Sequence, residues 1–117
     1  MEKTTVQSFF DLVNERNLDK LESLLSHNAE FFFPKTQPLI GKERIIQFLS
    51  LLFKQYPELS FTVERIIIQE NQAAVLWANK GRNRKNQTYE NEGVTILEAE
   101  KEKITFISDF FKDTGKF

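Results

Sequence analysis

The sequence predicts one α+β domain, in which helices come first and strands follow. Apolar residues recur at helical spacing up to Pro57, whereas β-branched and aromatic runs separated by short polar turns dominate the rest of the chain. The length of 117 residues is typical of one domain, and no repeat or linker rich in proline and glycine divides it. We therefore expect residues 1–117 to form a single domain.

Two helices are expected before residue 29. Thr4 fits a capping box as the N-cap of an amphipathic helix over residues 5–15. Asn17 is a favourable N-cap for a second, shorter helix, which we expect to end at His27. At a helix end the single histidine would interact favourably with the helix dipole, so a structural role is expected for it.

A short strand and a third helix follow. The strand covers residues 29–33 and ends at Pro34. Residues 34–41 hold two prolines and a glycine, which predicts a loop. Pro57 ends the third helix. The apolar face of that helix consists of Ile45, Phe48, Leu49, Leu52 and Tyr56.

Four further strands are predicted, over residues 59–68, 73–79, 89–97 and 104–111. Alternation in the last strand places Ile104, Phe106 and Phe110 on one face, and Ile107, Asp109 and Phe111 on the other. A strand that is apolar on both faces is covered on both faces. Because the helices can cover only one, we expect a homodimer that packs sheet to sheet.

Composition excludes several classes of function. With 16 basic and 17 acidic residues the net charge is −1, so no overall field would steer the chain onto nucleic acid or a membrane surface. The absence of cysteine excludes disulfides, thiolate metal sites and cysteine nucleophiles. The chain begins without a signal-peptide pattern, and its apolar runs are too short to span a bilayer. We expect a cytoplasmic protein with no nucleic-acid partner, membrane partner, metal or organic cofactor.

A basic cluster follows the second long strand and consists of Lys80, Arg82, Arg84 and Lys85. A solvated hairpin tip is the simplest interpretation. Attraction of an anionic ligand to a cavity mouth is an alternative, and so is contact with nucleic acid. The cluster lacks the interleaved aromatic residues of a single-strand binder.

Five segments match a known family in order and spacing: Asn17-Leu18-Asp19-Lys20-Leu21, Gly41-Lys42-Glu43, Val75-Leu76-Trp77, Glu92-Gly93-Val94-Thr95-Ile96 and Ser108-Asp109-Phe110-Phe111. They resemble the SnoaL-like polyketide cyclase family, within the nuclear transport factor 2-like and ketosteroid isomerase-like fold. The resemblance implies a cone-shaped, curved antiparallel sheet closed by three N-terminal helices, as in the cystatin-like roll. It also implies a cavity that encloses a small, largely apolar or carbonyl-containing molecule.

Asp109 is the candidate catalytic residue, because it lies between apolar residues on a strand that reads as buried. Burial would raise the pKa of its carboxyl toward the range useful for proton transfer. The resemblance implies acid/base chemistry beside a carbonyl, such as isomerisation or aldol-type cyclisation. The alternative is a structural carboxyl bonded to a backbone amide or a neighbouring side chain. The family ending Asp-Tyr-Phe-Asp is altered here, because Phe110 replaces the tyrosine and the second acid is shifted to Asp113.

The remaining candidates are expected to bind ligand. Phe31, Phe33, Phe48, Leu52, Trp77 and Phe111 would line the cavity, while Asn79, Tyr89 and Asn91 could orient a carbonyl or hydroxyl group. Ordinary cross-strand pairing is the alternative for the two asparagines. An apolar face at Phe31 and Phe33, where related domains often carry an acid or a histidine, favours binding over catalysis. A non-catalytic binding or dimeric interaction module is therefore the second function considered.

Overall fold

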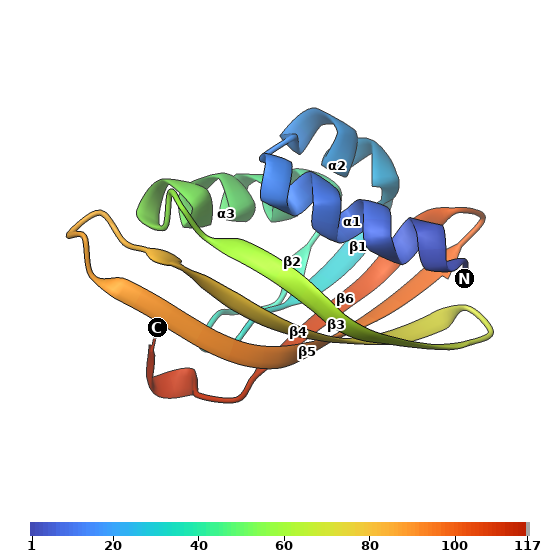
Figure 1. Ribbon diagram of the computed structural model, residues 1–117. Helices are drawn as coiled ribbons and strands as arrows, with labels where there is room; N and C mark the ends of the chain where they lie inside the picture. Colours follow the sequence, from blue (N-terminus) through green and yellow to red (C-terminus); the bar gives the residue numbers. More distant parts are fainter. Residues whose placement is uncertain (117) are drawn as a thin grey trace.

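Three helices lie over one face of a curved sheet in the computed structural model, which describes residues 1–116 (Figure 1). The helices are α1 (Lys3–Glu15), α2 (Leu18–Leu24) and α3 (Lys42–Gln55). The strands are β1 (Leu25–Phe32), β2 (Leu39–Ile40), β3 (Ser60–Gln69), β4 (Gln72–Arg82), β5 (Thr88–Glu100) and β6 (Lys103–Phe111), followed by the short 3₁₀ helix η1 (Thr114–Lys116). The predicted α+β class and the cone of sheet and helices are confirmed. No helix within residues 1–116 is long and apolar enough to cross a membrane.

The strands form one open sheet in the order β2-β1-β6-β5-β4-β3. β3 to β6 form an antiparallel meander, and β2 pairs antiparallel with β1. β1 and β6 instead pair in parallel. A parallel pair needs a long crossover, which α3 and the first three strands of the meander supply.

The predicted cap of α1 is wrong. The helix begins at Lys3 with Glu2 as N-cap, and the N–H groups of Thr5 and Val6 donate to the Glu2 carbonyl at 3.1 and 3.4 Å. The Thr4 hydroxyl lies inside the first turn and donates to the Glu2 carboxylate at 3.4 Å. Backbone bonds to Glu2 thus extend the helix past the residue that would have capped it.

The cap of α2 is confirmed, but its predicted end is wrong. Asn17 Oδ1 accepts a bond from the backbone N–H of Lys20 at 3.2 Å. The helix stops before His27, because Leu25 already has extended backbone and pairs with Ile104 of β6. Strand pairing with a distant segment, rather than the local helical pattern, therefore determines where the helix ends.

A β-bulge changes the faces of β6. Glu98 pairs with Phe106 and Ala99 with Ile104, which leaves Thr105 as an extra residue. Side chains on either side of the bulge exchange faces, so Ile104 points inward and is fully buried. The prediction that Ile104 shares a face with Phe106 is therefore wrong.

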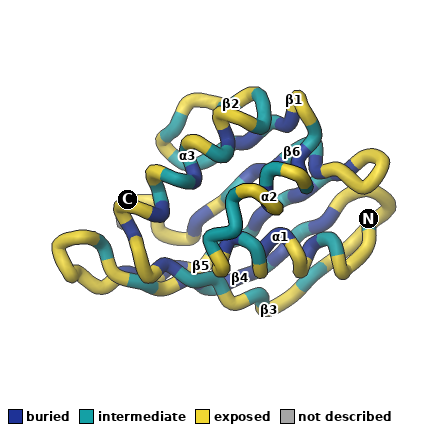
Figure 2. Tube along the Cα trace, turned by 90° about the horizontal axis from the view of Figure 1, so that it is seen from above, coloured by how far each residue is buried: buried dark blue, intermediate teal, exposed yellow. Residues whose placement is uncertain are grey.

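The inner face of the sheet carries the core, and buried residues concentrate between the sheet and the helices (Figure 2). Strand pairing places Phe31, Ile107, Leu97 and Ala73 in one row, Asp109, Thr95 and Val75 in the next, and Phe111, Gly93, Trp77 and Val63 in a third. α1 closes this face at one side with its buried residues Val6, Phe9, Phe10 and Val13.

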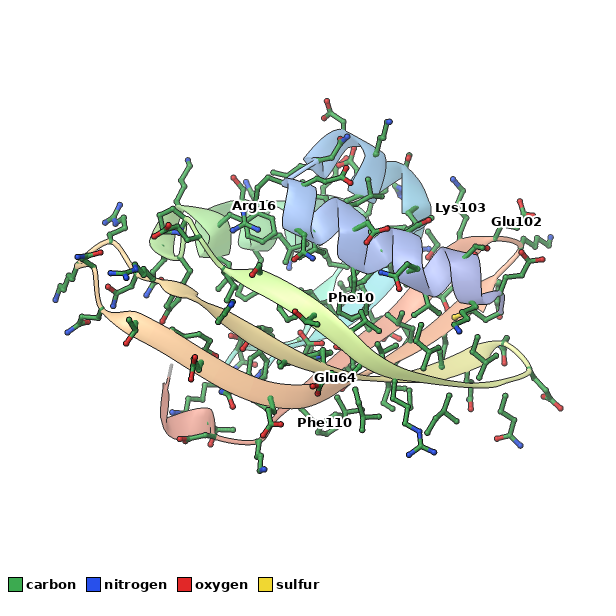
Figure 3. All side chains as sticks on the ribbon, in the orientation of Figure 1. Phe10, Arg16, Glu64, Glu102, Lys103 and Phe110 are labelled. Carbon is green, nitrogen blue, oxygen red and sulfur yellow. The ribbon has the colours of Figure 1, made fainter. Side chains whose placement is uncertain are left out.

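Apolar side chains also occupy the outer face of the sheet. The rings of Phe32 and Phe106 contact each other, with their centroids 5.4 Å apart. Phe110 is 59% exposed and points away from the helices (Figure 3). β6 is thus apolar on both faces, and a second copy covering the outer face stays a prediction.

Candidate functional site

Asp109 lies on the inner face of β6, directly opposite Thr95 of β5. The Thr95 hydroxyl donates to Asp109 Oδ1 at 2.6 Å and accepts a bond from the indole Nε1–H of Trp77 at 2.8 Å. Thr95 and Trp77 are 2% and 1% exposed. A buried chain of hydrogen bonds therefore runs across three strands, from the indole to the carboxyl.

The electrostatic setting of Asp109 favours the protonated form. Although Asp109 is only partly buried as a whole residue, its carboxyl group is surrounded by protein. Burial raises the pKa of Asp109 from 3.8 to about 7, and the hydrogen bond from Thr95 offsets only part of this rise. A carboxyl with a pKa near neutrality can both accept and return a proton at physiological pH.

An enclosed cavity of about 10 Å³ lies between the last turn of α3 and the sheet. It is lined by Phe33, Leu52, Tyr56, Leu59, Phe61, Asn79, Tyr89 and Phe111. This volume holds about one water molecule. Any larger ligand would therefore have to displace side chains, most simply the aromatic rings of the lining.

Five residues expected to bind ligand line this cavity: Phe33, Leu52, Asn79, Tyr89 and Phe111. Phe31, Phe48 and Trp77 do not line it and pack behind the lining rings. The centroids of Phe33 and Phe48 are 5.0 Å apart, and those of Trp77 and Phe111 are 4.9 Å apart. Asp109 also lies outside the lining, in the row of the sheet next to Phe111.

Sequence reasoning missed three lining residues, Tyr56, Leu59 and Phe61. The sequence places Tyr56 on the apolar face of the third helix, just before the proline that ends the helix, and this was a signal for it. Phe61 pairs with Asn79 across β3 and β4, so it shares the inner face with that residue. Alternation alone could have placed Phe61 on one face of its strand, but the register that brings it to Asn79 has no local signal.

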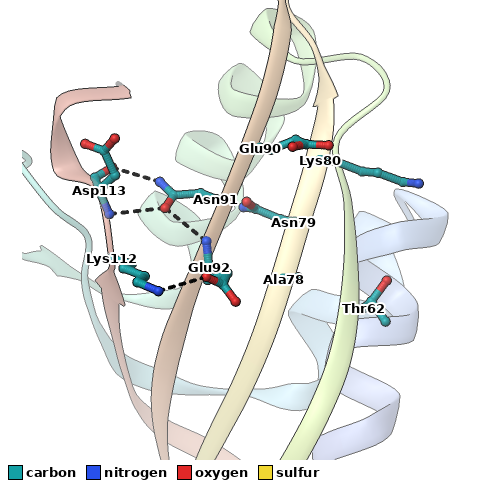
Figure 4. A pocket seen from close by; sticks show the side chains of 9 residues that line it. All are labelled: Thr62, Ala78, Asn79, Lys80, Glu90, Asn91, Glu92, Lys112 and Asp113. Atoms are coloured by element: carbon teal, nitrogen blue, oxygen red, sulfur yellow. Dashed lines mark hydrogen bonds and ion pairs between the residues drawn. The ribbon is translucent and has the colours of Figure 1, made fainter.

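Asn91 is fully engaged by the protein. Its Nδ2 donates to the Tyr89 hydroxyl at 3.2 Å. Figure 4 shows its other bonds: Nδ2 donates to the Asp113 carbonyl at 2.8 Å, and Oδ1 accepts from the N–H groups of Asp113 and Glu92 at 3.2 and 2.9 Å. The side chain therefore fastens the segment after β6 to the sheet, which is the structural alternative considered for this asparagine.

Asn79 has the opposite environment. It is 3% exposed, and neither Nδ2 nor Oδ1 makes a hydrogen bond of normal geometry within residues 1–116. Its amide is close enough to the Tyr89 hydroxyl to lower the pKa of that group, whose net shift is upward because of burial. Buried amides almost always have partners, so Asn79 is an exception that needs an explanation.

A larger hollow of about 620 Å³ lies on the outer face, over β3, β4 and β5 (Figure 4). It is an open groove crossed by the exposed ion pair of Lys112 and Glu92 at 3.2 Å. Its lining is mostly polar or charged, and Asp109 is on the other side of the sheet. The groove is far larger than the interior cavity, but Asp109, the carboxyl with the raised pKa, does not line it.

Comparison with known proteins agrees with this architecture. The SnoaL-like domain family matches residues 6–107, which is most of the chain. The chain belongs to the SnoaL-like domain family. No curated protein matches it significantly.

Solved structures with the same fold come from several bacteria. A nuclear transport factor 2-like protein of unknown function from Exiguobacterium is 21% identical, with a TM-score of 0.84 over 93% of this chain and 98% of that one. A candidate SnoaL-like polyketide cyclase from Jannaschia is 19% identical, with a TM-score of 0.85 over 93% and 83%. A ketosteroid isomerase-like protein from Catenulispora acidiphila, in complex with trimethylamine, is 13% identical, with a TM-score of 0.86 over 94% and 86%. At these identities the likeness establishes the fold.

Gly93 allows the Trp77 indole to lie across β5. A Cβ at this position would come within 2.7 Å of the indole ring and overlap the Phe110 carbonyl. We expect Gly93→Ala to lower the free energy of unfolding by about 3 kcal/mol, measured by urea denaturation, because neither obstacle can move freely. Gly115→Ala near the C-terminus is the control and should change it little. An unchanged midpoint for Gly93→Ala would contradict the position given to the indole.

Proposed function

We propose that this SnoaL-like domain binds a small, largely apolar molecule that contains a carbonyl group, and that Asp109 transfers a proton beside that carbonyl without a cofactor. The inward carboxyl with a pKa near 7, joined to Thr95 and Trp77, carries the proposal. A family that includes cyclases and isomerases supports it.

The proposed chemistry begins with ionised Asp109, which removes a hydrogen from the carbon beside the carbonyl. The electron pair of that C–H bond forms an enolate, and the proton stays on the Asp109 carboxyl. Returning the proton to a different carbon gives an isomerisation. Alternatively, the enolate carbon attacks a second carbonyl in an aldol-type ring closure, and the resulting alkoxide takes the proton back from Asp109. Thr95 holds Oδ1 by its 2.6 Å bond, so Oδ2 is the oxygen that exchanges the proton.

Access to Asp109 requires movement of aromatic rings. The closed cavity has room for about one water, and Phe111 lies between it and the row of Asp109. The rings of Phe111 and Phe33 contact each other, with centroids 5.3 Å apart. A change of χ1 rotamer in these two side chains would move the rings aside and join the cavity to the carboxyl.

Exchange of α-hydrogens for deuterium tests the proposal without knowledge of the substrate. Small β,γ-unsaturated cyclic ketones are incubated with the protein in deuterated water, and NMR follows exchange and double-bond migration. We expect the native protein to accelerate exchange and Asp109→Asn to lose at least about a hundredfold of that rate. Asp11→Asn, an exposed acid on α1, should keep the full rate. Equal rates for the native protein and Asp109→Asn would refute the catalytic role.

A non-catalytic binding or interaction module is the second candidate, because the interior is nearly filled by aromatic side chains. In both candidates we propose a homodimer through the outer face of the sheet. The apolar residues there include Phe32, Leu76, Val94, Phe106 and Phe110, all at least partly exposed in one copy.

The dimer is tested by placing a charge on the outer face. Phe110→Glu should convert a dimer at micromolar concentration into a monomer in sedimentation equilibrium, because the carboxylate would have to be buried in an apolar interface. Leu51→Glu is the matched control, since Leu51 is 64% exposed on α3 and away from the sheet. A native protein that sediments as a monomer would count against the interface.

A further inference from the structure

Asn79 is the polar side chain of the interior cavity that the protein satisfies least, because its amide approaches the Tyr89 hydroxyl without making a hydrogen bond of normal geometry. It is buried on the inner face of β4, and both atoms of its amide lack hydrogen bonds of normal geometry. The lining around it is apolar or aromatic apart from the hydroxyl groups of Tyr56 and Tyr89. An amide in such a place destabilises the folded protein, because it loses its bonds to water without replacing them.

Two other buried polar side chains of the sheet are satisfied within the protein. Asn91 lies directly opposite Asn79 on β5, and both of its amide atoms are bonded within the protein. The Thr95 hydroxyl likewise both donates and accepts a hydrogen bond within the protein. The unsatisfied amide of Asn79 is therefore a local exception, and it occurs where an enclosed cavity adjoins it.

The chemistry of the missing partner follows from the amide itself. Nδ2 can only donate and Oδ1 can only accept, so one ligand group satisfies both if it carries an acceptor and a donor side by side. A carboxamide or a lactam has this arrangement and is neutral. A carboxylate lacks the donor, an ammonium group lacks the acceptor, and either charge would be costly to bring into this apolar interior.

We propose that Asn79 recognises a neutral carboxamide or lactam of the ligand by a two-way hydrogen-bonded pair, with the apolar body of the ligand against Phe33, Phe61 and Phe111. This inference rests on the proposed binding of a small molecule in the interior and names its class. It does not depend on proton transfer by Asp109, which lies beyond Phe111. Bridging of Asn79 by one buried water is the competing explanation, because the closed cavity has room for about one.

Two probes of similar size and different polarity test the proposal, benzamide and ethylbenzene. NMR titration of the native protein should show that benzamide binds at least about tenfold more tightly, because only it satisfies the buried amide. Asn79→Leu keeps the branching of the side chain at Cγ and removes the polar atoms. This variant should lose the preference for benzamide, bind ethylbenzene at least as well as the native protein, and melt at a higher temperature. Asn71→Leu, in the exposed turn before β4, is the control and should retain the native preference.

The outcomes separate this inference from the proposed function. Equal binding of the two probes by the native protein, or a retained benzamide preference in Asn79→Leu, would overturn the role of Asn79 while leaving an interior binding site. A lower melting temperature for Asn79→Leu without any probe preference would establish the buried-water explanation and overturn the inference. Failure of both probes to bind would count against the interior site itself and the inference together.

Discussion

Asp109→Asn should stabilise the protein at and above pH 7 and have little effect near pH 3. Burial raises the pKa of Asp109 from 3.8 to about 7, so between these values the folded protein keeps a proton that the unfolded chain releases. The free energy of unfolding therefore falls as the pH rises through this window and levels off above it. Each pH unit within the window lowers that free energy by about 1.4 kcal/mol, so the full loss reaches about 4 kcal/mol. Asparagine has a similar shape and no charge, so the variant avoids this loss.

Urea denaturation of both proteins at several pH values measures the effect. The difference in unfolding free energy should grow from near zero at about pH 3 to a few kcal/mol in favour of the variant at about pH 8. Asp11→Asn, exposed on α1, should give a difference that does not follow this trend. A variant less stable than the native protein at every pH would mean that the ionised carboxyl has favourable partners, and the raised pKa would be wrong.

Arg16→Met should be the most destabilising substitution among the charged residues near the helix ends. Arg16 follows α1, and its guanidinium donates to the carbonyls of Val13, Tyr56, Pro57 and Leu59 at 3.1, 3.4, 3.1 and 2.7 Å. It also lies over the Phe53 ring, 4.4 Å from the centroid. Methionine keeps the apolar stem and removes all four of these bonds and the ring contact, so the free energy of unfolding should fall by about 3 kcal/mol, although the Val13 and Tyr56 carbonyls keep backbone donors.

This side chain joins α1 to the end of α3 and the start of β3, where Tyr56 and Leu59 line the cavity. Arg16→Lys should recover less than half of the loss, because a single ammonium group cannot reach four carbonyls. Arg44→Met, exposed on α3, is the control and should melt like the native protein. The melting temperatures of the native protein and the three variants, measured by thermal denaturation, give the comparison. Equal melting of Arg16→Met and the native protein would show that the carbonyls find other donors.

Local pattern predicted the α+β class and much of the helix and strand order, because hydrophobic spacing and proline stops are local signals. It also predicted that Asp109 shares a face with Phe111, since both lie on the same side of the bulge in β6. The face of Ile104 and the end of the second helix were wrong for one physical reason. Both depend on pairing between segments far apart in the sequence, which no neighbouring residue indicates.

The candidate site was predicted in part. Alternation identified residues that face inward, but it could not show that Asn91 would be bonded to Asp113 while Asn79 would be left unsatisfied. It also could not show how completely aromatic rings fill the interior. Those properties arise from side-chain packing after the sheet has formed, and they decide between a solid core and a site that opens.

The protonation state of the Asp109 carboxyl is measured most directly through its hydrogen-bonded neighbour. Trp77 is the single tryptophan of the chain, so its indole N–H gives one unambiguous NMR resonance, and Thr95 links that group to the carboxyl. The account predicts a pH titration of this resonance with a midpoint near 7, absent in Asp109→Asn. A midpoint near 4, or a titration that persists in the variant, would contradict it.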